Sequence, residues 1–178
     1  MATVIDGSAS VTINSGAVLG ITSGTAVAST SGTSIDFTGI PNWVKRITVM
    51  LVGVSTNGSS DPILRLGTSG GIESTSYAGS VTTNYGTNAG SYTQSISTGF
   101  DAVYDWGSTE AIAGQYIVSL VGSNVWVCTW AFGHTNGNRT QFGGGTKTLS
   151  GTLDRIRFTT ANGTDTFDAG SINIMYEG

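Results

Sequence analysis

Charged side chains are scarce in this chain. Its 178 residues include 7 Lys and Arg, 11 Asp and Glu and one His, for a formal net charge of −4 at pH 7. An acidic chain with so few cations lacks the basic surface of a nucleic-acid-binding protein and the polybasic patch of a protein that binds anionic membranes. We therefore expect neither nucleic acid nor a membrane among its partners.

Cysteine and long apolar runs are also nearly absent. The single cysteine, Cys128, cannot form an internal disulfide. The longest apolar run, from Val49 to Val54, is far shorter than the roughly 20 residues of a membrane-spanning helix. Residues 1–16 combine neither a basic segment nor an unbroken apolar segment, so we expect no secretory signal and synthesis in a reducing cytoplasm.

Small and β-forming residues dominate instead. The chain holds 27 Gly, 22 Ser and 27 Thr but only seven Leu, two Lys and three Glu. Helix-forming residues are thus rare, while Thr, Val, Ile and aromatic residues, which favour strands, are plentiful. Aromatic residues make up 9% of the chain, too many for a disordered segment. The composition predicts an all-β protein of one domain.

The first forty residues contain no Trp, Tyr, Lys or Arg, and they include three consecutive octads. The octads read SGAVLGIT, SGTAVAST and SGTSIDFT, and each begins with Ser-Gly and ends with Thr. An even period returns equivalent side chains to one face of a strand, which favours a thin arm formed by several chains winding together. Coincidence in a chain rich in Gly, Ser and Thr is the alternative. The anchoring positions that this repeat predicts are Ser15, Gly16, Ser23, Gly24, Ser31 and Gly32.

Short alternating apolar segments bounded by Gly and Asn follow from residue 41 onward. They predict a jelly-roll-like β-sandwich over residues 41–178, with residues 1–40 as an N-terminal arm. Gly114 is expected to form a bulge. We expect long surface loops over much of residues 67–99 and a flexible connection at Gly143–Gly145. The expected strands cover 47–52, 63–66, 112–121, 125–132, 153–160 and 171–177, with 91–97 as a further candidate.

Residues that carry chemistry are few. His134 is the only histidine, and no G-x-S-x-G motif is present, so a Ser-His-Asp triad is disfavoured against a loop histidine beside a turn. Cys128 alternates with Trp126 and Trp130 and is expected to be a buried apolar residue. One His and one Cys cannot supply the four ligands of a structural zinc site. We expect no catalytic site and no cofactor.

Calcium, which binds to oxygen ligands, has two candidate clusters of acids. Asp101, Asp105 and Glu110 form one, and Asp165 with Asp168 forms the other. Neither cluster has the D-x-D-x-D spacing of a calcium-binding loop. The sequence therefore predicts no metal site.

Aromatic residues in polar segments are the most informative feature for binding. A flat ring packs well on the C–H face of a sugar, while neighbouring polar groups bind its hydroxyls. On this basis Tyr85, Tyr92, Tyr104, Asp105 and Trp106 are candidates for glycan binding. The alternative for Tyr104 and Trp106 is that they cap the hydrophobic core.

Two long segments read STSGTSIDFTGIPNWVKRITVMLVGVSTNG (residues 29–58) and SGTLDRIRFTTANGTDTFDAGSINIMYEG (residues 150–178). They resemble a domain of tailed-bacteriophage virion proteins, often the terminal part of tail fibres or related appendages. The features in common are Phe37–Pro41, Lys45-Arg46, Leu153-Asp154-Arg155 and the closing Ile172–Tyr176. These are strand and turn elements, so the resemblance implies a common fold without a transferable active site. It also implies a virion part assembled in the bacterial cytoplasm, with a homotrimer as the expected oligomer.

Three functions follow as expectations. The first is a non-enzymatic short tail fibre that attaches to other virion proteins through its arm and binds a host-surface glycan. The second is a capsid decoration protein, whose arm bridges capsomers and which binds no host receptor. The third is a small depolymerase, which we place last because no pair of acids is arranged for glycoside hydrolysis.

Overall fold

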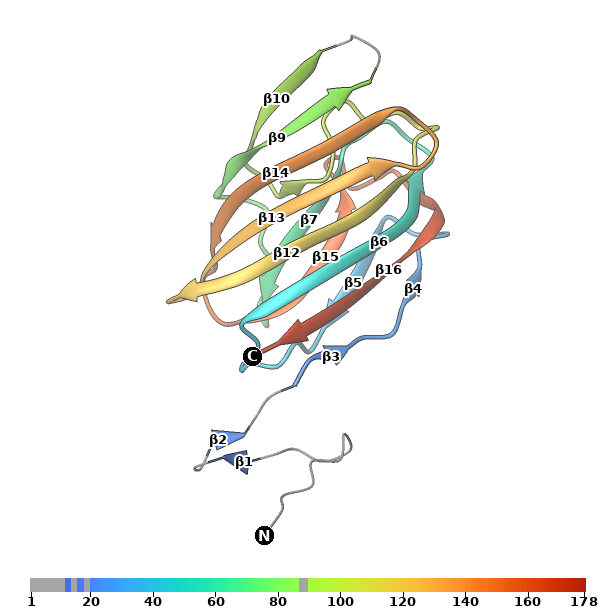
Figure 1. Cartoon of the computed structure of the whole chain (residues 1–178). Coiled ribbons are helices and arrows are strands. Elements are labelled where there is room, and N and C mark those ends of the chain that lie inside the picture. The colour runs from blue at the N-terminus through green and yellow to red at the C-terminus, as the bar shows by residue number, and fades with distance from the viewer. Residues whose placement is uncertain (1–11, 14–15, 18–19, 87–89) are drawn as a thin grey trace.

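The computed structural model describes residues 20–86 and 90–178, together with the backbone of residues 12–13 and 16–17. The described residues form an all-β structure without helices, in which two antiparallel sheets pack face to face as a sandwich (Figure 1). The predicted all-β sandwich is thus confirmed, and the jelly-roll connectivity stays a prediction. The described part of the chain contains no helix long and apolar enough to cross a membrane.

The larger sheet has nine strands and forms the front layer of Figure 1. Strands that are neighbours in the sequence pair at β9–β10, β12–β13 and β13–β14, whereas the pairs β9–β14, β6–β12 and β6–β16 bring together segments far apart in the chain. In spatial order the strands are β10 (Ser91–Ile96), β9 (Tyr77–Tyr85), β14 (Arg139–Thr148), β13 (Val125–His134), β12 (Ile112–Gly122), β6 (Arg46–Thr56) and β16 (Phe167–Glu177), with β3 (Thr22–Ser23) and β4 (Val27–Ala28) both on the outer edge of β16.

The smaller sheet lies behind the first and has five strands. A separate pair, β1 (Thr12–Ile13) and β2 (Gly16–Ala17), lies near the N-terminus. The strands of the smaller sheet are β11 (Phe100–Asp101), β7 (Pro62–Thr68), β15 (Leu153–Thr160) and β5 (Ser34–Thr38), with β8 (Gly71–Ile72) paired to β7.

The hydrophobic core lies between the two sheets. Tyr116 of β12 is fully buried, and its hydroxyl donates a hydrogen bond to the carbonyl oxygen of Phe100 at 3.0 Å. Its ring lies 4.9 Å from Phe132 of the same sheet and 6.3 Å from Phe158 of the opposite sheet. A buried aromatic ring contributes more apolar area than any other side chain, so this cluster is a principal link between the layers.

Two sequence features are confirmed in the central strands. Trp126, Cys128, Trp130 and Phe132 of β13 all point inward and are buried, as their alternation predicts. The pairing of β12 with β6 shifts register between Ile112 and Gly114, which is the expected bulge. A Cβ atom on Gly114 would lie 2.1 Å from the carbonyl oxygen of Ala131, so a side chain is excluded there.

The prediction of long surface loops in residues 67–99 is wrong for most of that segment. Nine residues form β9, which pairs along its whole length with β14, and six more form β10. The inward side chains Tyr77, Val81 and Thr83 are buried, but Ala, Gly and Ser occupy the positions between them. The apolar alternation is therefore weak, and pairing with a neighbour decides the structure instead of propensity.

The flexible connection expected at Gly143–Gly145 is also wrong, because all three glycines lie inside β14. A Cβ atom on Gly143 would meet the indole ring of Trp130 at 2.1 Å, and one on Gly145 would meet the carbonyl oxygen of Ala78 at 2.8 Å. The glycines thus make room for an aromatic ring and for close strand packing, which is a regular use of Gly in a strand.

The structure differs from the predicted arm for much of residues 20–40. Strands β3 and β4 pair with β16, and β5 pairs with β15, so these segments belong to the sandwich. Gly24 donates its amide to the carbonyl oxygen of Ile174 at 2.8 Å, and the buried Ser29 hydroxyl donates to that of Ala169 at 2.7 Å. Of the predicted anchoring positions, Ser15 lies outside the described residues, Gly16 belongs to β2, Ser23 belongs to β3, and Ser31 and Gly32 lie in the bend before β5.

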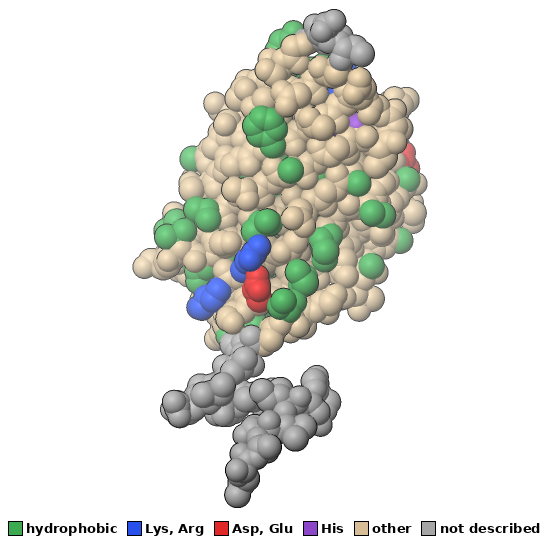
Figure 2. Space-filling model, viewed as in Figure 1, with side chains coloured by type: hydrophobic (Ala, Val, Ile, Leu, Met, Phe, Trp, Pro, Cys, Tyr) green, Lys and Arg blue, Asp and Glu red, His purple; other side chains and the backbone are tan. Residues whose placement is uncertain are grey.

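The outer face of the larger sheet is poor in charge. Figure 2 shows charged side chains gathered near one end of this face, with separate hydrophobic side chains scattered elsewhere. At the end of β6 and β16, Arg46 forms an ion pair with Glu177 at 3.2 Å. Val52 and Phe142 are the bulky apolar residues that β6 and β14 expose, at 62% and 51%.

Candidate functional site

Four of the five predicted glycan-binding residues surround one hollow. Tyr85 lies at the end of β9, Tyr92 lies on the neighbouring edge strand β10, and Tyr104 and Asp105 belong to the segment between β11 and β12. Together they line a hollow of about 370 Å³. This volume lies within the range of small-molecule sites, and the lining combines aromatic rings with a carboxylate.

Trp106, the fifth candidate, does not reach this hollow. Its side chain is only 4% exposed, and its indole Nε1 donates a hydrogen bond to Thr56 Oγ1 at 2.8 Å. Its backbone amide donates to Asp61 Oδ1 at 3.0 Å. The glycan-binding assignment of Trp106 is therefore wrong, because its ring and its polar atom are both used by the core. Tyr104 is half-buried, so part of its ring packs on the core as well.

The ring of Tyr85 is fixed from three sides. Its hydroxyl donates to Asp105 Oδ2 at 2.8 Å, and the ring of Tyr92 meets it edge-on at a centroid distance of 5.7 Å. The guanidinium of Arg139 lies 4.4 Å from the ring centroid, a favourable cation–π distance. Burial and the hydrogen bond to Asp105 raise the pKa of Tyr85 to about 12, so the phenol stays a neutral donor.

Asp105 has an uncommon backbone conformation for a residue with a side chain. Its φ of 65° lies in the left-handed region, which Asp tolerates better than most residues. Arg139 Nη1 donates to its carbonyl oxygen at 3.1 Å and thereby holds the turn. Strained conformations of this kind are common at binding sites, because they aim a side chain that a regular turn would direct elsewhere.

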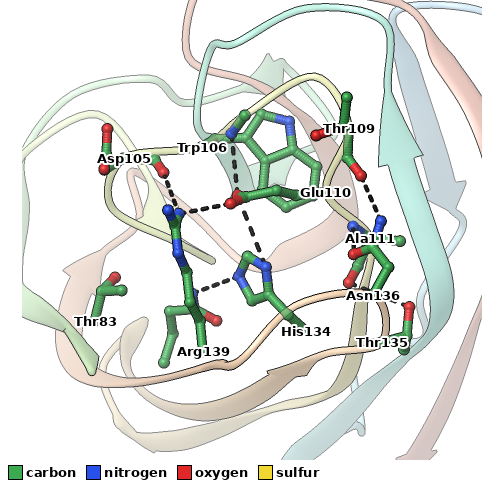
Figure 3. Close-up of polar contacts among 12 residues, drawn as sticks. Thr83, Asp105, Trp106, Thr109, Glu110, Ala111, His134, Thr135, Asn136 and Arg139 are labelled. Carbon is green, nitrogen blue, oxygen red and sulfur yellow. Dashed lines mark hydrogen bonds and ion pairs between the residues drawn. The ribbon is translucent and has the colours of Figure 1, made fainter. Parts of the chain in front are cut away.

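A polar cluster around Glu110 holds Arg139 in place beside Tyr85 and Asp105 (Figure 3). Glu110 accepts a hydrogen bond from the amide of Gly107 at 3.0 Å and forms an ion pair with Arg139 at 2.6 Å. The same carboxylate lies 3.8 Å from Nδ1 of His134, and the His134 Nε2 lies 2.6 Å from the amide nitrogen of Gln141. Glu110 is therefore shared between a cation and an imidazole, and Arg139 connects it to Asp105 and Tyr85.

His134 differs from the expected loop histidine. It ends strand β13, its side chain is fully buried, and the ring of Trp106 lies 6.1 Å away. Burial lowers the pKa of His134 below its usual value, although Glu110 opposes this, so the ring is neutral at pH 7. A buried, neutral imidazole that contacts Glu110 and Gln141 has a structural role here and does not face the hollow.

Sequence reasoning missed Arg139 and Gln141 as neighbours of the predicted site, and it grouped Glu110 with Asp105 only as candidate calcium ligands. Arg139 and Gln141 point to the same face of β14 because they are two residues apart, and β14 pairs Arg139 directly with Tyr85. This pairing could be inferred only after β9 had been recognised as a strand. Glu110 lies five residues after Asp105, but only the fold of the intervening turn brings it to Arg139.

The arrangement suits binding through ring contacts and hydrogen bonds. Within the described residues, no group of three or more His, Cys, Asp or Glu is placed to hold a metal ion. The acids of the two calcium candidates lie in other contacts: Asp105 accepts from Tyr85, Glu110 pairs with Arg139, and Asp165 accepts from the amide of Ser60 at 2.9 Å.

Comparison with known proteins adds no relative. No protein-family model matches the chain, and a search of curated proteins likewise finds no match.

Proposed function

We propose that this chain is a non-enzymatic virion surface protein that binds a host-surface glycan in the hollow of Tyr85, Tyr92, Tyr104 and Asp105. The observation that carries the proposal is this convergence of three tyrosines and one carboxylate from separate segments of the chain. Sugar rings pack on aromatic faces, and a carboxylate accepts hydrogen bonds from neighbouring hydroxyls. The hydroxyls of Tyr92 and Tyr104 add hydrogen-bonding groups for further sugar hydroxyls.

Glycan binding fits the lining better than glycan cleavage. Glycoside hydrolysis in most families needs two carboxyl groups on opposite sides of the scissile bond. Of the residues that line the hollow, Asp105 alone carries a carboxylate. Glu110 is the next acid along the chain, but Arg139 and the amide of Gly107 occupy its oxygens. A small depolymerase therefore remains the less favoured alternative.

The virion setting rests on the resemblance of residues 29–58 and 150–178 to the terminal domains of phage tail appendages. Both segments contribute central strands of the sandwich, namely β6, β15 and β16. A tail appendage that binds a host glycan needs such a stable scaffold, with a binding hollow at the edge of the scaffold. A capsid decoration protein needs no such hollow, so it is the second candidate.

The experiment uses Tyr92→Ala, because this side chain is 56% exposed and its loss should leave the core intact. The purified protein and the variant are applied to an array of bacterial O-antigen and capsular oligosaccharides. We expect the protein to bind at least one glycan and Tyr92→Ala to weaken that binding about five- to tenfold, since a ring contact contributes about 1 kcal/mol.

Phe142→Ala is the matched control. Phe142 is 51% exposed but lies on the outer face of β14, away from the hollow. Its removal should leave binding unchanged. Failure of the protein to bind any glycan, or an equal loss in both variants, would contradict the proposal.

A further inference from the structure

The charged side chains around the hollow of Tyr85, Tyr92, Tyr104 and Asp105 leave a net negative charge. Arg139 is the nearest cation, and Glu110 neutralises it through the 2.6 Å ion pair. Tyr85 and His134 are both neutral at pH 7. The carboxylate of Asp105 therefore has no counter-ion among the described residues, although the Tyr85 hydroxyl donates to one of its oxygens.

A second acid adds to this negative charge. Asp61 lies near enough for Asp105 and Glu110 both to raise its pKa, in addition to the larger effect of burial. The backbone amide of Trp106 joins Asp61 to the segment that carries Asp105. A ligand with its own carboxylate would thus enter a region of like charge, at a cost that grows as water is displaced.

A second hollow adjoins the first at Tyr85. Its volume is also about 370 Å³, and Tyr85 lines both hollows. Arg139 and His134 also line the second hollow, and Glu110 neutralises Arg139 through the 2.6 Å ion pair. The rest of its lining is mainly polar, with Asn84 from β9, Asn138 from the turn before β14 and Thr140 from β14. Amide and hydroxyl groups of this kind bind sugar hydroxyls and carry no charge.

We infer that the ligand is an uncharged oligosaccharide of at least two sugar rings. This inference rests on the proposed function. One ring packs among Tyr85, Tyr92 and Tyr104 and donates hydroxyl hydrogen bonds to Asp105. The next ring crosses Tyr85 and lies in the polar hollow of Asn84, Asn138 and Thr140. Asp105 selects against uronic acids and other acidic sugars through repulsion.

The test measures affinities by titration calorimetry at pH 7 with matched probes. These are the trisaccharides of glucose, galactose and mannose, their trisaccharide counterparts built from the corresponding uronic acids, and the three free monosaccharides. We expect the best neutral trisaccharide to bind at least about tenfold more tightly than its uronate counterpart and than its own monosaccharide.

Two variants test whether Asp105 causes the preference for neutral sugars and whether Asn138 causes the preference for a trisaccharide. Asp105→Asn keeps the shape and tolerates the same backbone conformation, so it should narrow the gap between the neutral and acidic trisaccharides severalfold. Asn138→Ala should weaken trisaccharide binding and leave monosaccharide binding unchanged. Phe142→Ala serves again as the control.

The outcomes separate this inference from the proposed function. Tighter binding of a uronate trisaccharide would overturn the assignment of an uncharged ligand. Equal affinity for monosaccharide and trisaccharide would overturn the second hollow as a subsite. Both results would leave glycan binding itself intact, whereas binding to none of the probes and to no glycan of the bacterial array would overturn both.

Discussion

Gly143 offers a sharp test of how β14 is packed. In Gly143→Ala the new Cβ atom would lie 2.1 Å from Cζ2 and 2.3 Å from Cε2 of Trp130, and 2.7 Å from the carbonyl oxygen of Ser80. Trp130 cannot easily move away, because it is 4% exposed and its ring lies 5.8 Å from Phe100 and 5.7 Å from Tyr116. Either the aromatic cluster or the pairing with β9 must shift.

Overpacking of a core typically costs about 1 to 3 kcal/mol. We expect Gly143→Ala to lie at the upper end, about 3 kcal/mol, because the clash involves both a buried ring and a backbone oxygen. Urea unfolding followed by tryptophan fluorescence measures the free energy of unfolding, and the loss should appear as a lower midpoint with an unchanged slope.

Gly144→Ala is the matched control on the next residue of the same strand. Its Cβ atom would point to the opposite face, where the nearest atom is the carbonyl oxygen of Cys128 at 3.8 Å, an ordinary contact. This variant should be neutral, or more stable by about 0.4 to 1 kcal/mol through the unfolded chain. If Gly143→Ala lies within about 0.5 kcal/mol of the unaltered protein, the close packing of Trp130 on Gly143 is refuted.

Two further predictions concern pH and the N-terminal residues. Burial, with a smaller effect from Asp61, raises the pKa of Asp101 to about 7. The folded protein therefore keeps a proton on Asp101 that the unfolded chain loses near pH 4. The free energy of unfolding should fall as pH rises from about 4 to about 7. Asp101→Asn should flatten this slope in urea unfolding at a series of pH values, and an unchanged slope would contradict the assignment. Deletion of residues 1–19 should preserve the free energy of unfolding, since β3 and β4 are retained. In light scattering we expect the full chain to have the mass of a homotrimer and the shortened chain that of a single chain; equal masses would contradict the expected role of these residues in oligomerisation.

Much of the central sheet could be predicted from the sequence. The alternation of Trp126, Cys128, Trp130 and Phe132 identifies both the strand and its buried face, because only one face of β13 meets the core. The Gly-Ser-Asn segment at 122–124 likewise marks the hairpin between β12 and β13. Strand β9 could not be predicted in this way, since Ala, Gly, Ser, Thr and Asn fill six of its nine positions and its stability comes from pairing with β14 and β10.

The candidate site was predicted in part. Exposed aromatic residues in polar segments pointed to Tyr85, Tyr92, Tyr104 and Asp105, and the fold places all four at one hollow. The same argument failed for Trp106, because a sequence shows the residue type without showing which way the chain turns. In the folded protein, Thr56 and Asp61 bind the indole and the backbone amide of Trp106, and the ring faces the core.

The excess of Gly, Ser and Thr and the scarcity of charge determined the fold class by themselves, because such a chain favours strands over helices and carries little for a charged partner to bind. Only the tertiary structure decided what individual small residues do. Gly143 is required because Trp130 packs on it, and Gly24 lies where an added Cβ atom would be only 3.0 to 3.1 Å from atoms of Asn173 and Ile174. The same holds for the site, where Arg139 and Glu110 act on Asp105 and Tyr85 across strand pairings that no local sequence pattern encodes.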